Sequence, residues 1–234
     1  TILYKARNLA IKKASGSLIA FLDTDDIWLP NKLKKQVPLF NDTDVGLVYG
    51  NCWIINENNI IKNKKIFSKK KLEKGMVTRS LLDDYKVGLL TIIIRKSFLE
   101  EKKNIFDTDY DLLGDYDFVI KFSLKHKFDC IQEPVAIYRR HENQLQRIYF
   151  KKQVEQLESW FSKIKSHSYL SSYSNFYSIK NKIEYMKIIS LIYDKKYFKS
   201  LDKIFRYPLS INKLKLILIL LLPDLILRRL RDYT

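Results

Sequence analysis

The chain opens with a helical pattern that ends in a short apolar run. Apolar residues recur at helical spacing over about residues 3 to 14, at Ile2, Ala6, Leu9, Ala10 and Ala14. Gly16 follows and suits the left-handed conformation that often ends a helix. Residues 17–22 are then almost continuously apolar, which is typical of a strand buried on both faces in a covered, largely parallel sheet.

Helix and strand patterns alternate over the next hundred residues. Residues 30–40 carry apolar positions at helical spacing behind an initial proline, and Pro38 is expected to shorten that helix. Residues 45–55 and 89–94 are rich in β-branched and aromatic side chains and predict strands. The mixture of helices and strands predicts an α/β fold.

Polar residues and a proline predict the structure of three later segments. Residues 56–75 are dense in Asn and Lys, which indicates a mobile, exposed connection. Residues 118–122 follow a second acidic region and predict a helix that enters the core. Residues 130–138 contain Pro134, which cannot donate a ladder hydrogen bond, so this segment is predicted to be a short edge strand.

After about residue 148 the chain becomes helical in pattern. Two amphipathic helices are indicated by Phe150, Val154, Leu157, Phe161 and Ile164, and by Phe176, Ile179, Ile183, Met186 and Ile189, with a Ser- and Tyr-rich loop at 166–174 between them. Residues 214–230 combine apolar bulk with arginines. That stretch suits a helix lying in an anionic membrane interface, and equally a core helix packed on the preceding pair. Residues 1–147 and 148–234 are therefore the two expected domains.

Composition narrows the class of protein. With 234 residues, 46% hydrophobic and 29% charged, the chain is globular in composition. A net charge of +17 favours anionic partners such as nucleic acid, anionic lipid or phosphorylated ligands. Cys52 and Cys130 lie far apart and have no CxxC partner or His/Cys cluster, which argues against a zinc site or a disulfide framework and favours the cytoplasm. A secretory signal and a membrane-spanning apolar run are both absent from the sequence pattern.

An acidic cluster, residues 23–26, directly follows the first predicted strand. Open α/β sheets bind ligands just beyond the carboxyl ends of their strands. Magnesium is commonly held by one or two carboxylates together with substrate phosphates, so the cluster predicts a metal-bound diphosphate. The tetrapeptide alone is equally compatible with a solvated turn that caps the following helix.

The motifs around this cluster resemble those of the family 2 glycosyltransferases of the GT-A fold. The resemblance rests on residues 6–10, 14–17 and 21–28, and on later segments that include 45–50, 94–97, 114–117, 133–134 and 138–143. It covers about residues 1–147 and implies a GT-A-like mixed sheet flanked by helices. The α-helical C-terminal region that follows is predicted from its periodicity and carries no signature of the family. The family's opening βαβ unit, which grips the nucleotide, has no counterpart before Thr1, so the resemblance is to a family member that lacks this unit.

The resemblance implies a role for each polar residue of the first half. In that family the acidic element holds Mn²⁺ or Mg²⁺ against the diphosphate of a nucleotide-sugar, which implicates Asp23 and Asp25 as metal ligands. Asp23 is also expected among the donor-binding residues, with Arg7, Asn8 and His141.

The usual Glu-Asp pair near the acceptor corresponds here to Gly114 and Asp115. Asp115 matches the general base, which accepts the proton of an acceptor hydroxyl during single displacement with inversion. Asp117 competes for this role and is expected to bind the acceptor; its simpler interpretation is a carboxylate at a helix N-terminus. The missing glutamate leaves its acceptor contact without a counterpart.

The expected function is therefore an inverting glycosyltransferase that moves a sugar from a UDP-sugar or similar donor to a cell-surface glycan or lipid-linked precursor. The protein is expected to be cytoplasmic and to associate peripherally with the inner face of the cell membrane. One alternative is a non-enzymatic basic module that binds nucleic acid or a membrane surface. Nucleic acid is disfavoured because RNA-binding motifs are lacking and the acidic cluster would repel phosphates without metal. Another alternative is an inactive, truncated relative of the transferases.

Overall fold

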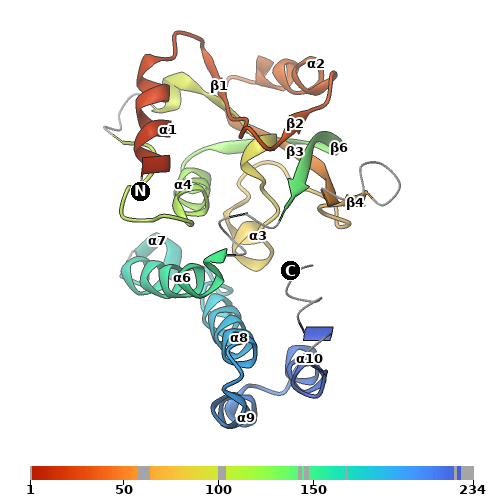
Figure 1. Ribbon diagram of the computed structural model, residues 1–234. Coiled ribbons are helices and arrows are strands. Elements are labelled where there is room, and N and C mark those ends of the chain that lie inside the picture. Colours follow the sequence, from red (N-terminus) through yellow and green to blue (C-terminus); the bar gives the residue numbers. More distant parts are fainter. Residues whose placement is uncertain are drawn as a thin grey trace. The chain divides into compact units, whose positions relative to one another are not determined.

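The structure is a computed structural model that describes residues 2–56, 64–99, 104–141, 144, 148–166, 168–223 and 226–227. By contacts the chain divides into two compact units, Thr1–His141 and Glu142–Thr234. The first unit is built on a β-sheet and the second on helices (Figure 1). The division by contacts falls after residue 141, and the expected domain boundary after residue 147 stays a prediction.

The first unit contains short helices and six strands. Its elements are α1 (Ile2–Lys13), β1 (Leu18–Ala20), β2 (Ile27–Trp28), α2 (Lys32–Gln36), η1 (Val37–Asn41), β3 (Val45–Asn56), β4 (Lys65–Ile66), α3 (Thr78–Asp83), η2 (Leu89–Thr91), β5 (Ile93–Arg95), η3 (Lys96–Leu99), α4 (Gly114–Ser123) and β6 (Lys127–Arg140). As predicted, the helix of residues 30–40 is cut at the proline, because its second half is a 3-10 helix with Pro38 near its start.

The sheet is mixed, as predicted, with the strand order β1-β5-β3-β6-β2 and β4 paired to β3. Its two long strands, β3 and β6, run parallel, and the remaining pairs are antiparallel. The prediction of a short edge strand at 130–138 was wrong, because β6 spans 14 residues and lies between β3 and β2. Pro134 is accommodated where the β3–β6 register shifts, opposite Asn51, so its missing N–H interrupts no regular ladder.

The first strand also differs from the expectation. Leu18–Ala20 ends the described strand order instead of lying inside a parallel sheet, and it pairs antiparallel with β5. Ile19 is buried, whereas Leu18 and Ala20 are half-buried and pack against the cluster that contains Phe40. Gly16 does not adopt the predicted left-handed conformation; among the described glycines, Gly75 alone has a positive φ, of 91°.

Helices cover both faces of the sheet. Successive residues of a strand point to opposite faces, and Val48 of β3 packs in a cluster with Phe40 of η1. The neighbouring Tyr49 meets Phe128, which continues through Phe122 into α4. The sheet is thus sandwiched between the α2–η1 segment and α4, which fixes the strand ends that carry the polar residues.

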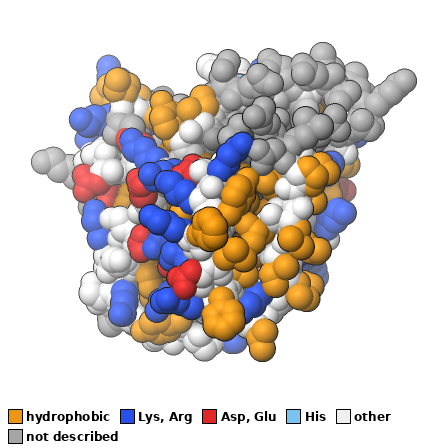
Figure 2. Space-filling model, turned by 60° about the horizontal axis from the view of Figure 1, so that its bottom comes forward, with side chains coloured by type: hydrophobic (Ala, Val, Ile, Leu, Met, Phe, Trp, Pro, Cys, Tyr) orange, Lys and Arg blue, Asp and Glu red, His pale blue; other side chains and the backbone are white. Residues whose placement is uncertain are grey.

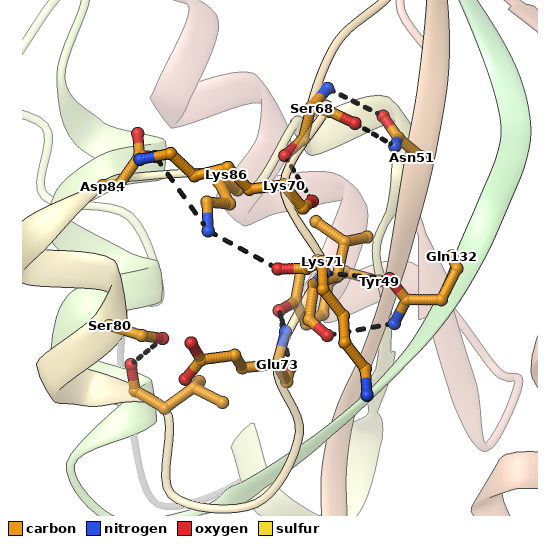
Figure 3. A network of polar contacts seen from close by, with 12 residues as sticks. Tyr49, Asn51, Ser68, Lys70, Lys71, Glu73, Ser80, Asp84, Lys86 and Gln132 are labelled. Atoms are coloured by element: carbon orange, nitrogen blue, oxygen red, sulfur yellow. Dashed lines mark hydrogen bonds and ion pairs between the residues drawn. The ribbon is translucent and has the colours of Figure 1, made fainter.

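The segment after β4 is fastened to the sheet instead of forming the free connection predicted for 56–75 (Figure 3). Asn51 bonds the backbone N–H and C=O of Ser68, and the Tyr49 hydroxyl does the same for Glu73. Gln132 of β6 completes the set by pairing with the backbone of Leu72. Residues 57–63 of the predicted connection lie outside the described residues.

The second unit is a helical cluster. It contains α6 (Phe150–Ile164), α7 (Ser168–Ser171), α8 (Ser178–Tyr193), α9 (Tyr197–Arg206) and α10 (Ile211–Leu220). The two amphipathic helices expected from the sequence are α6 and α8, and the predicted loop between them contains α7. Ile188, Ile192, Ile204 and Leu216 bring α8, α9 and α10 into one core. Over its described residues the chain has no helix long and apolar enough to cross a bilayer.

Candidate active site

The acidic cluster forms the turn between β1 and β2. The backbone N–H of Asp26 donates to the Asp23 carbonyl at 3.1 Å, which closes this turn. β2 then pairs antiparallel with the end of β6, with Ile27 opposite Ile137. That register carries the last residues of β6 alongside the acidic turn, which explains how residues more than a hundred positions apart come to share one site.

Arg139 and His141 secure the turn from the β6 side. The Arg139 backbone N–H donates to Asp26 Oδ1 at 3.2 Å, and its guanidinium donates to the backbone carbonyls of Thr24 and Asp25. His141 Nε2 lies 3.0 Å from Asp25 Oδ2. The structure therefore brings the predicted donor residue His141 into contact with the predicted metal ligand Asp25.

Arg7 of α1 secures the turn from the opposite side. Its Nη2 atom donates to Asp23 Oδ1 at 2.6 Å and to Asp23 Oδ2 at 2.9 Å. Both carboxylate oxygens of Asp23 are thus engaged with a cation. The prediction that Asp23 ligates a metal remains a prediction, and in this arrangement its carboxylate faces Arg7.

Asp115 stands at the start of α4 beside the same helix α1. The Tyr4 hydroxyl donates to Asp115 Oδ1 at 3.3 Å, and the Asp115 backbone N–H lies 3.4 Å from that hydroxyl oxygen. Tyr4 and Arg7 are three residues apart and so lie on one face of α1, and the Arg7 guanidinium sits 5.5 Å from the Tyr4 ring centre. One turn of α1 therefore connects the acidic turn to the predicted general base.

Burial shifts the two buried carboxyl groups of this region toward their neutral forms. It raises the pKa of Asp26 to about 7, and the neighbouring charges of Asp25 and Asp23 act in the same direction. Burial also raises the pKa of Asp115, whereas the Tyr116 backbone N–H, the Arg7 charge and the Tyr4 hydroxyl lower it. A carboxylate with a raised pKa is a stronger base, which suits proton abstraction near neutral pH.

The protein side chains alone do not supply all the ligands that a divalent cation needs. No group of three or more His, Cys, Asp or Glu side chains converges within the described ranges. Asp25 and His141 nevertheless form an adjacent oxygen and nitrogen pair, with the Asp25 side chain 40% exposed. Mg²⁺ usually takes one or two protein carboxylates and completes its shell with water and phosphate oxygens, so this pair fits a cation that a diphosphate helps to hold.

Asn8 and Asp117 are placed differently from the expectation. Asn8 is buried, and its amide bonds the backbone of residues 105–106 in both directions, at 2.8 to 3.1 Å. Asp117 is 2% exposed and pairs with Lys121 at 2.7 Å on its own helix. The Asn8 amide is thus bonded to a loop and the Asp117 carboxylate to α4, and the donor and acceptor roles expected for them stay predictions.

The sequence reasoning missed Tyr4 and gave no role to Arg139. Arg139 lay within a quoted motif, but its bonds to the turn depend on the β2–β6 register. The sequence contained one indirect indication of a bulky neighbour such as Tyr4, which is the glycine at position 114 in place of the family's glutamate. A Cβ on Gly114 would lie 2.8 Å from the Tyr4 ring, so the absent glutamate and the buried tyrosine occupy the same space.

Comparison with known proteins gives matches to glycosyltransferases. Residues 3–101 match the family described as "Glycosyl transferase family 2". A stretch of 94 residues is 39% identical to the Escherichia coli protein named UDP-Glc:alpha-D-GlcNAc-diphosphoundecaprenol beta-1,3-glucosyltransferase WfgD, covering 40% of this chain and 35% of that protein. An uncharacterized glycosyltransferase of Methanocaldococcus jannaschii is 32% identical over 167 residues, covering 69% of this chain and 54% of its own length. The chain thus spans about a third to a half of these two relatives.

Among solved structures, Staphylococcus aureus TarS, residues 1–349, in complex with UDP-GlcNAc has a similar fold. The TM-score is 0.53 at 15% identity, and the match covers 87% of this chain and 61% of the TarS chain. At that identity the likeness concerns the fold, and it agrees with the mixed, helix-flanked sheet and the helical C-terminal region described above.

Proposed function

Because the chain belongs to glycosyltransferase family 2, we propose that it takes part in transferring a sugar from a nucleotide-diphosphate sugar, with UDP as the nucleotide, to an acceptor hydroxyl. The observation that carries this proposal is the position of α1. Through Arg7 and Tyr4, one turn of this helix contacts both Asp23 of the acidic turn and Asp115. This supports the proposal, because α1 would hold the diphosphate-binding turn and the base at a fixed separation, as a displacement reaction needs.

In the proposed reaction Asp115 acts as the general base. Its carboxylate takes the proton of the acceptor hydroxyl while the oxygen forms a bond to the anomeric carbon. The bond from that carbon to the diphosphate oxygen breaks, and its electron pair leaves with the nucleoside diphosphate, so the configuration inverts. Burial of Asp115 supports this role because it raises the pKa of the carboxyl.

The leaving diphosphate requires a positive environment. Asp25 and His141 would hold Mn²⁺ or Mg²⁺ against it, and the bound ion would stabilise the charge that develops on the leaving oxygens. Arg7 lies beside this position and adds a fixed guanidinium next to Asp23. Asn8 and Asp117 have no part in the proposed reaction, since their side chains are used within the fold.

The proposed acceptor is a cell-surface glycan or its lipid-linked precursor. Support comes from the names of two relatives: the E. coli protein is named for a diphosphoundecaprenol acceptor, and an Erwinia amylovora relative, 29% identical over 140 residues, for amylovoran biosynthesis. A lipid-linked acceptor is presented at a membrane, so we place the protein peripherally on the inner face of the cell membrane.

The test is turnover of a UDP-sugar with Mn²⁺ or Mg²⁺ by the full-length protein that carries this chain. Asp25→Ala and Asp115→Asn are each expected to lower kcat at least 100-fold while the circular dichroism spectrum and Tm stay unchanged. Asp44→Asn is the matched control, because Asp44 is an exposed carboxylate paired with Lys127 elsewhere on the unit. Wild-type turnover in both site variants would refute the assignment. Salt-sensitive nucleic-acid binding without turnover would favour the basic binding module instead.

A further inference from the structure

The last two helices of the second unit leave a broad set of apolar side chains in solvent. Phe198 is 91% exposed, Phe205 84% and Leu209 92%. We call the whole set the outer face; it consists of Phe198, Leu201, Phe205, Leu209, Ile211, Leu214, Leu218 and Leu221. Figure 2 shows hydrophobic side chains gathered over one side of the molecule, beside a strip rich in Lys and Arg.

Helical periodicity places these side chains on two continuous stripes. In α9 the exposed positions 198, 201 and 205 are three and four residues apart, and positions 211, 214 and 218 of α10, with residue 221 at its C-terminal end, repeat this spacing. In α9 the core residue Ile204 lies at one edge of the same apolar face, and the opposite face is polar. In α10 the core residue Leu216 lies on the side away from the exposed residues, so this helix is apolar on two sides.

Basic residues border the outer face. Lys199, Arg206 and Lys215 are exposed on the same two helices, and Lys213 reaches back from α10 to the backbone carbonyls of Phe205 and Tyr207. Asp202 is the single acidic residue of α9 and α10, and Arg206 neutralises it at 2.9 Å. The border therefore carries a net positive charge.

We propose that the outer face docks in the interface of an anionic lipid membrane. Two phenylalanines and a row of leucines would enter the boundary between headgroups and acyl chains, while the bordering lysines and arginine meet the lipid phosphates. A second copy of the chain fits this face less well, because two such faces would bring their basic borders together. The proposal extends the predicted interface helix at 214–230 to α9, and it does not depend on sugar transfer.

Vesicle flotation tests it directly. The anionic vesicles consist of phosphatidylcholine with about 30% phosphatidylglycerol, which gives a strongly anionic surface. The full chain is expected to float with these vesicles and to bind pure phosphatidylcholine vesicles at least tenfold more weakly. Phe198→Ser/Phe205→Ser is expected to lower binding to the anionic vesicles at least tenfold. Met76→Ser/Ile148→Ser is the matched control, since both side chains are exposed apolar residues outside α9 and α10.

Two further measurements keep the result unambiguous. If the outer face is open in the folded protein, Phe198→Ser/Phe205→Ser leaves Tm unchanged, whereas a fall in Tm shows that the chain itself covers the face. Light scattering reports the mass in solution. Absence of flotation, equal flotation of the variant, or a wild-type dimer that the variant converts to monomer would each overturn the proposal.

A second inference concerns Tyr4 and is carried by a different observation. The Tyr4 side chain is 2% exposed, and its ring fills the space in which residue 114 would carry a side chain, with ring carbons 2.8 to 2.9 Å from an ideal Cβ. Its hydroxyl meets Asp115 at 3.3 Å. The position next to Asp115 is therefore occupied by a phenol from α1 instead of a side chain from α4.

The groups around Asp115 come from three elements. Tyr4 and Arg7 approach from α1, and Tyr116 is the next residue on α4. Tyr85 follows α3 and packs against Tyr116, with ring centres 4.8 Å apart and the rings tilted by 57°. Among these, the Arg7 charge, the Tyr4 hydroxyl and the Tyr116 backbone N–H favour the ionised carboxylate. The Tyr116 backbone N–H and the Tyr4 hydroxyl both donate to Asp115 Oδ1, at 2.9 and 3.3 Å, and Tyr4 is the side chain that also fills the space beside residue 114.

We infer that Tyr4 is a positioning residue, which holds the Asp115 carboxylate in its reactive orientation and takes the volume that a glutamate at 114 would need. This inference rests on the proposed base role of Asp115. It requires glycine at 114, because any side chain there displaces the Tyr4 ring.

Tyr4→Phe tests the inference, because it keeps the ring and removes the hydroxyl. Loss of a hydrogen bond to the charged form raises the pKa of Asp115, so the acid limb of the kcat/KM profile should move up by about half to one pH unit. kcat should fall with little change in acceptor KM. Tyr49→Phe is the matched control: it removes a buried hydroxyl that bonds the Glu73 backbone, away from the site, and should leave the acid limb in place.

Carbon-13 titration of the Asp115 carboxyl separates the two proposals. A raised pKa in Tyr4→Phe supports the positioning role even if the wild-type chain shows no turnover, in which case the proposed function alone fails. Equal carboxyl titration in wild type and Tyr4→Phe would overturn the positioning role, whatever the activity.

Discussion

Arg7 holds both carboxylate oxygens of Asp23 from one guanidinium nitrogen, at 2.6 and 2.9 Å. The Asp23 side chain is 47% exposed, and exposed ion pairs contribute about 0 to 1 kcal/mol to stability. The Arg7–Asp23 pair therefore contributes little to the stability of the folded chain. The role that we propose for it is to orient the acidic turn and to place a cation beside the diphosphate of the donor.

Arg7→Ala is accordingly expected to separate activity from stability. The free energy of unfolding should fall by less than about 1 kcal/mol, while KM for the nucleotide-sugar should rise at least tenfold because a cation near the diphosphate is lost. Urea unfolding and steady-state kinetics give the two values. Lys127→Ala, which removes the partner of exposed Asp44, is the control for an ion pair away from the site. Equal kinetics in the two variants would contradict the role given to Arg7.

Asn8→Ala is expected to act through stability. Its amide oxygen accepts from the backbone N–H groups of Ile105 and Phe106, and its nitrogen donates to the Phe106 carbonyl. Leaving buried backbone groups without partners costs about 1 to 3 kcal/mol, so urea unfolding should shift by roughly that amount. Asn104→Ala, in which an exposed bond to Lys12 is lost, should change stability far less. If Asn8→Ala left stability unchanged and raised KM for the nucleotide-sugar, the result would support the donor-binding prediction instead.

Lys32→Met is expected to flatten the pH dependence of stability. Lys32 is 1% exposed beneath Trp28, and burial lowers its pKa to about 7. Above pH 7 the unfolded chain keeps a proton on this lysine that the folded chain has lost, so wild-type stability rises toward pH 9 by on the order of 1 kcal/mol per pH unit. The variant loses this slope. Urea titrations at several pH values between 7 and 9 measure it, and Lys5→Met, an exposed lysine of α1, should retain it.

Gly50→Ala tests the packing of the central strands. A Cβ at this position would lie 2.7 Å from Val135 Cγ2 on the parallel neighbour β6. Forcing a methyl group into a packed core costs about 1 to 3 kcal/mol, which thermal or urea unfolding would detect. At Gly16 the nearest atom is 3.4 Å away, so Gly16→Ala should be close to neutral. Similar losses at both positions would show that backbone freedom, and not the contact with Val135, decides the effect.

The elements that form locally were accessible from the sequence. The helical spacing at residues 3–14 and the β-branched run at 45–55 correspond to α1 and β3 within one or two residues. The acidic turn was found because it follows an apolar run. In each case the deciding interactions lie within a few residues of one another, and periodicity records them.

Pro134 shows where this reasoning failed, and Asn8 shows a set of contacts that it did not anticipate. A proline in a short apolar segment predicts an edge strand, but the register shift beside Asn51 accommodates Pro134 inside a central strand. Asn8 lies in a motif near the donor, but a loop almost a hundred residues later takes up its amide. Both outcomes depend on partners that are distant in the sequence, which a local pattern does not encode.

The sequence by itself predicted several of the helices, among them α1, α6 and α8, the long strand β3, the acidic turn and the residue types that a metal-bound diphosphate and a base require. The tertiary structure decided their partners: His141 on Asp25, Arg7 on Asp23, and Tyr4 on Asp115 in the space left by Gly114. It also decided that α9 and α10 present an apolar face outward. The physical reason is that helix and strand periodicity is set over a few residues, whereas side-chain partners and exposure are set by packing between segments far apart in the chain.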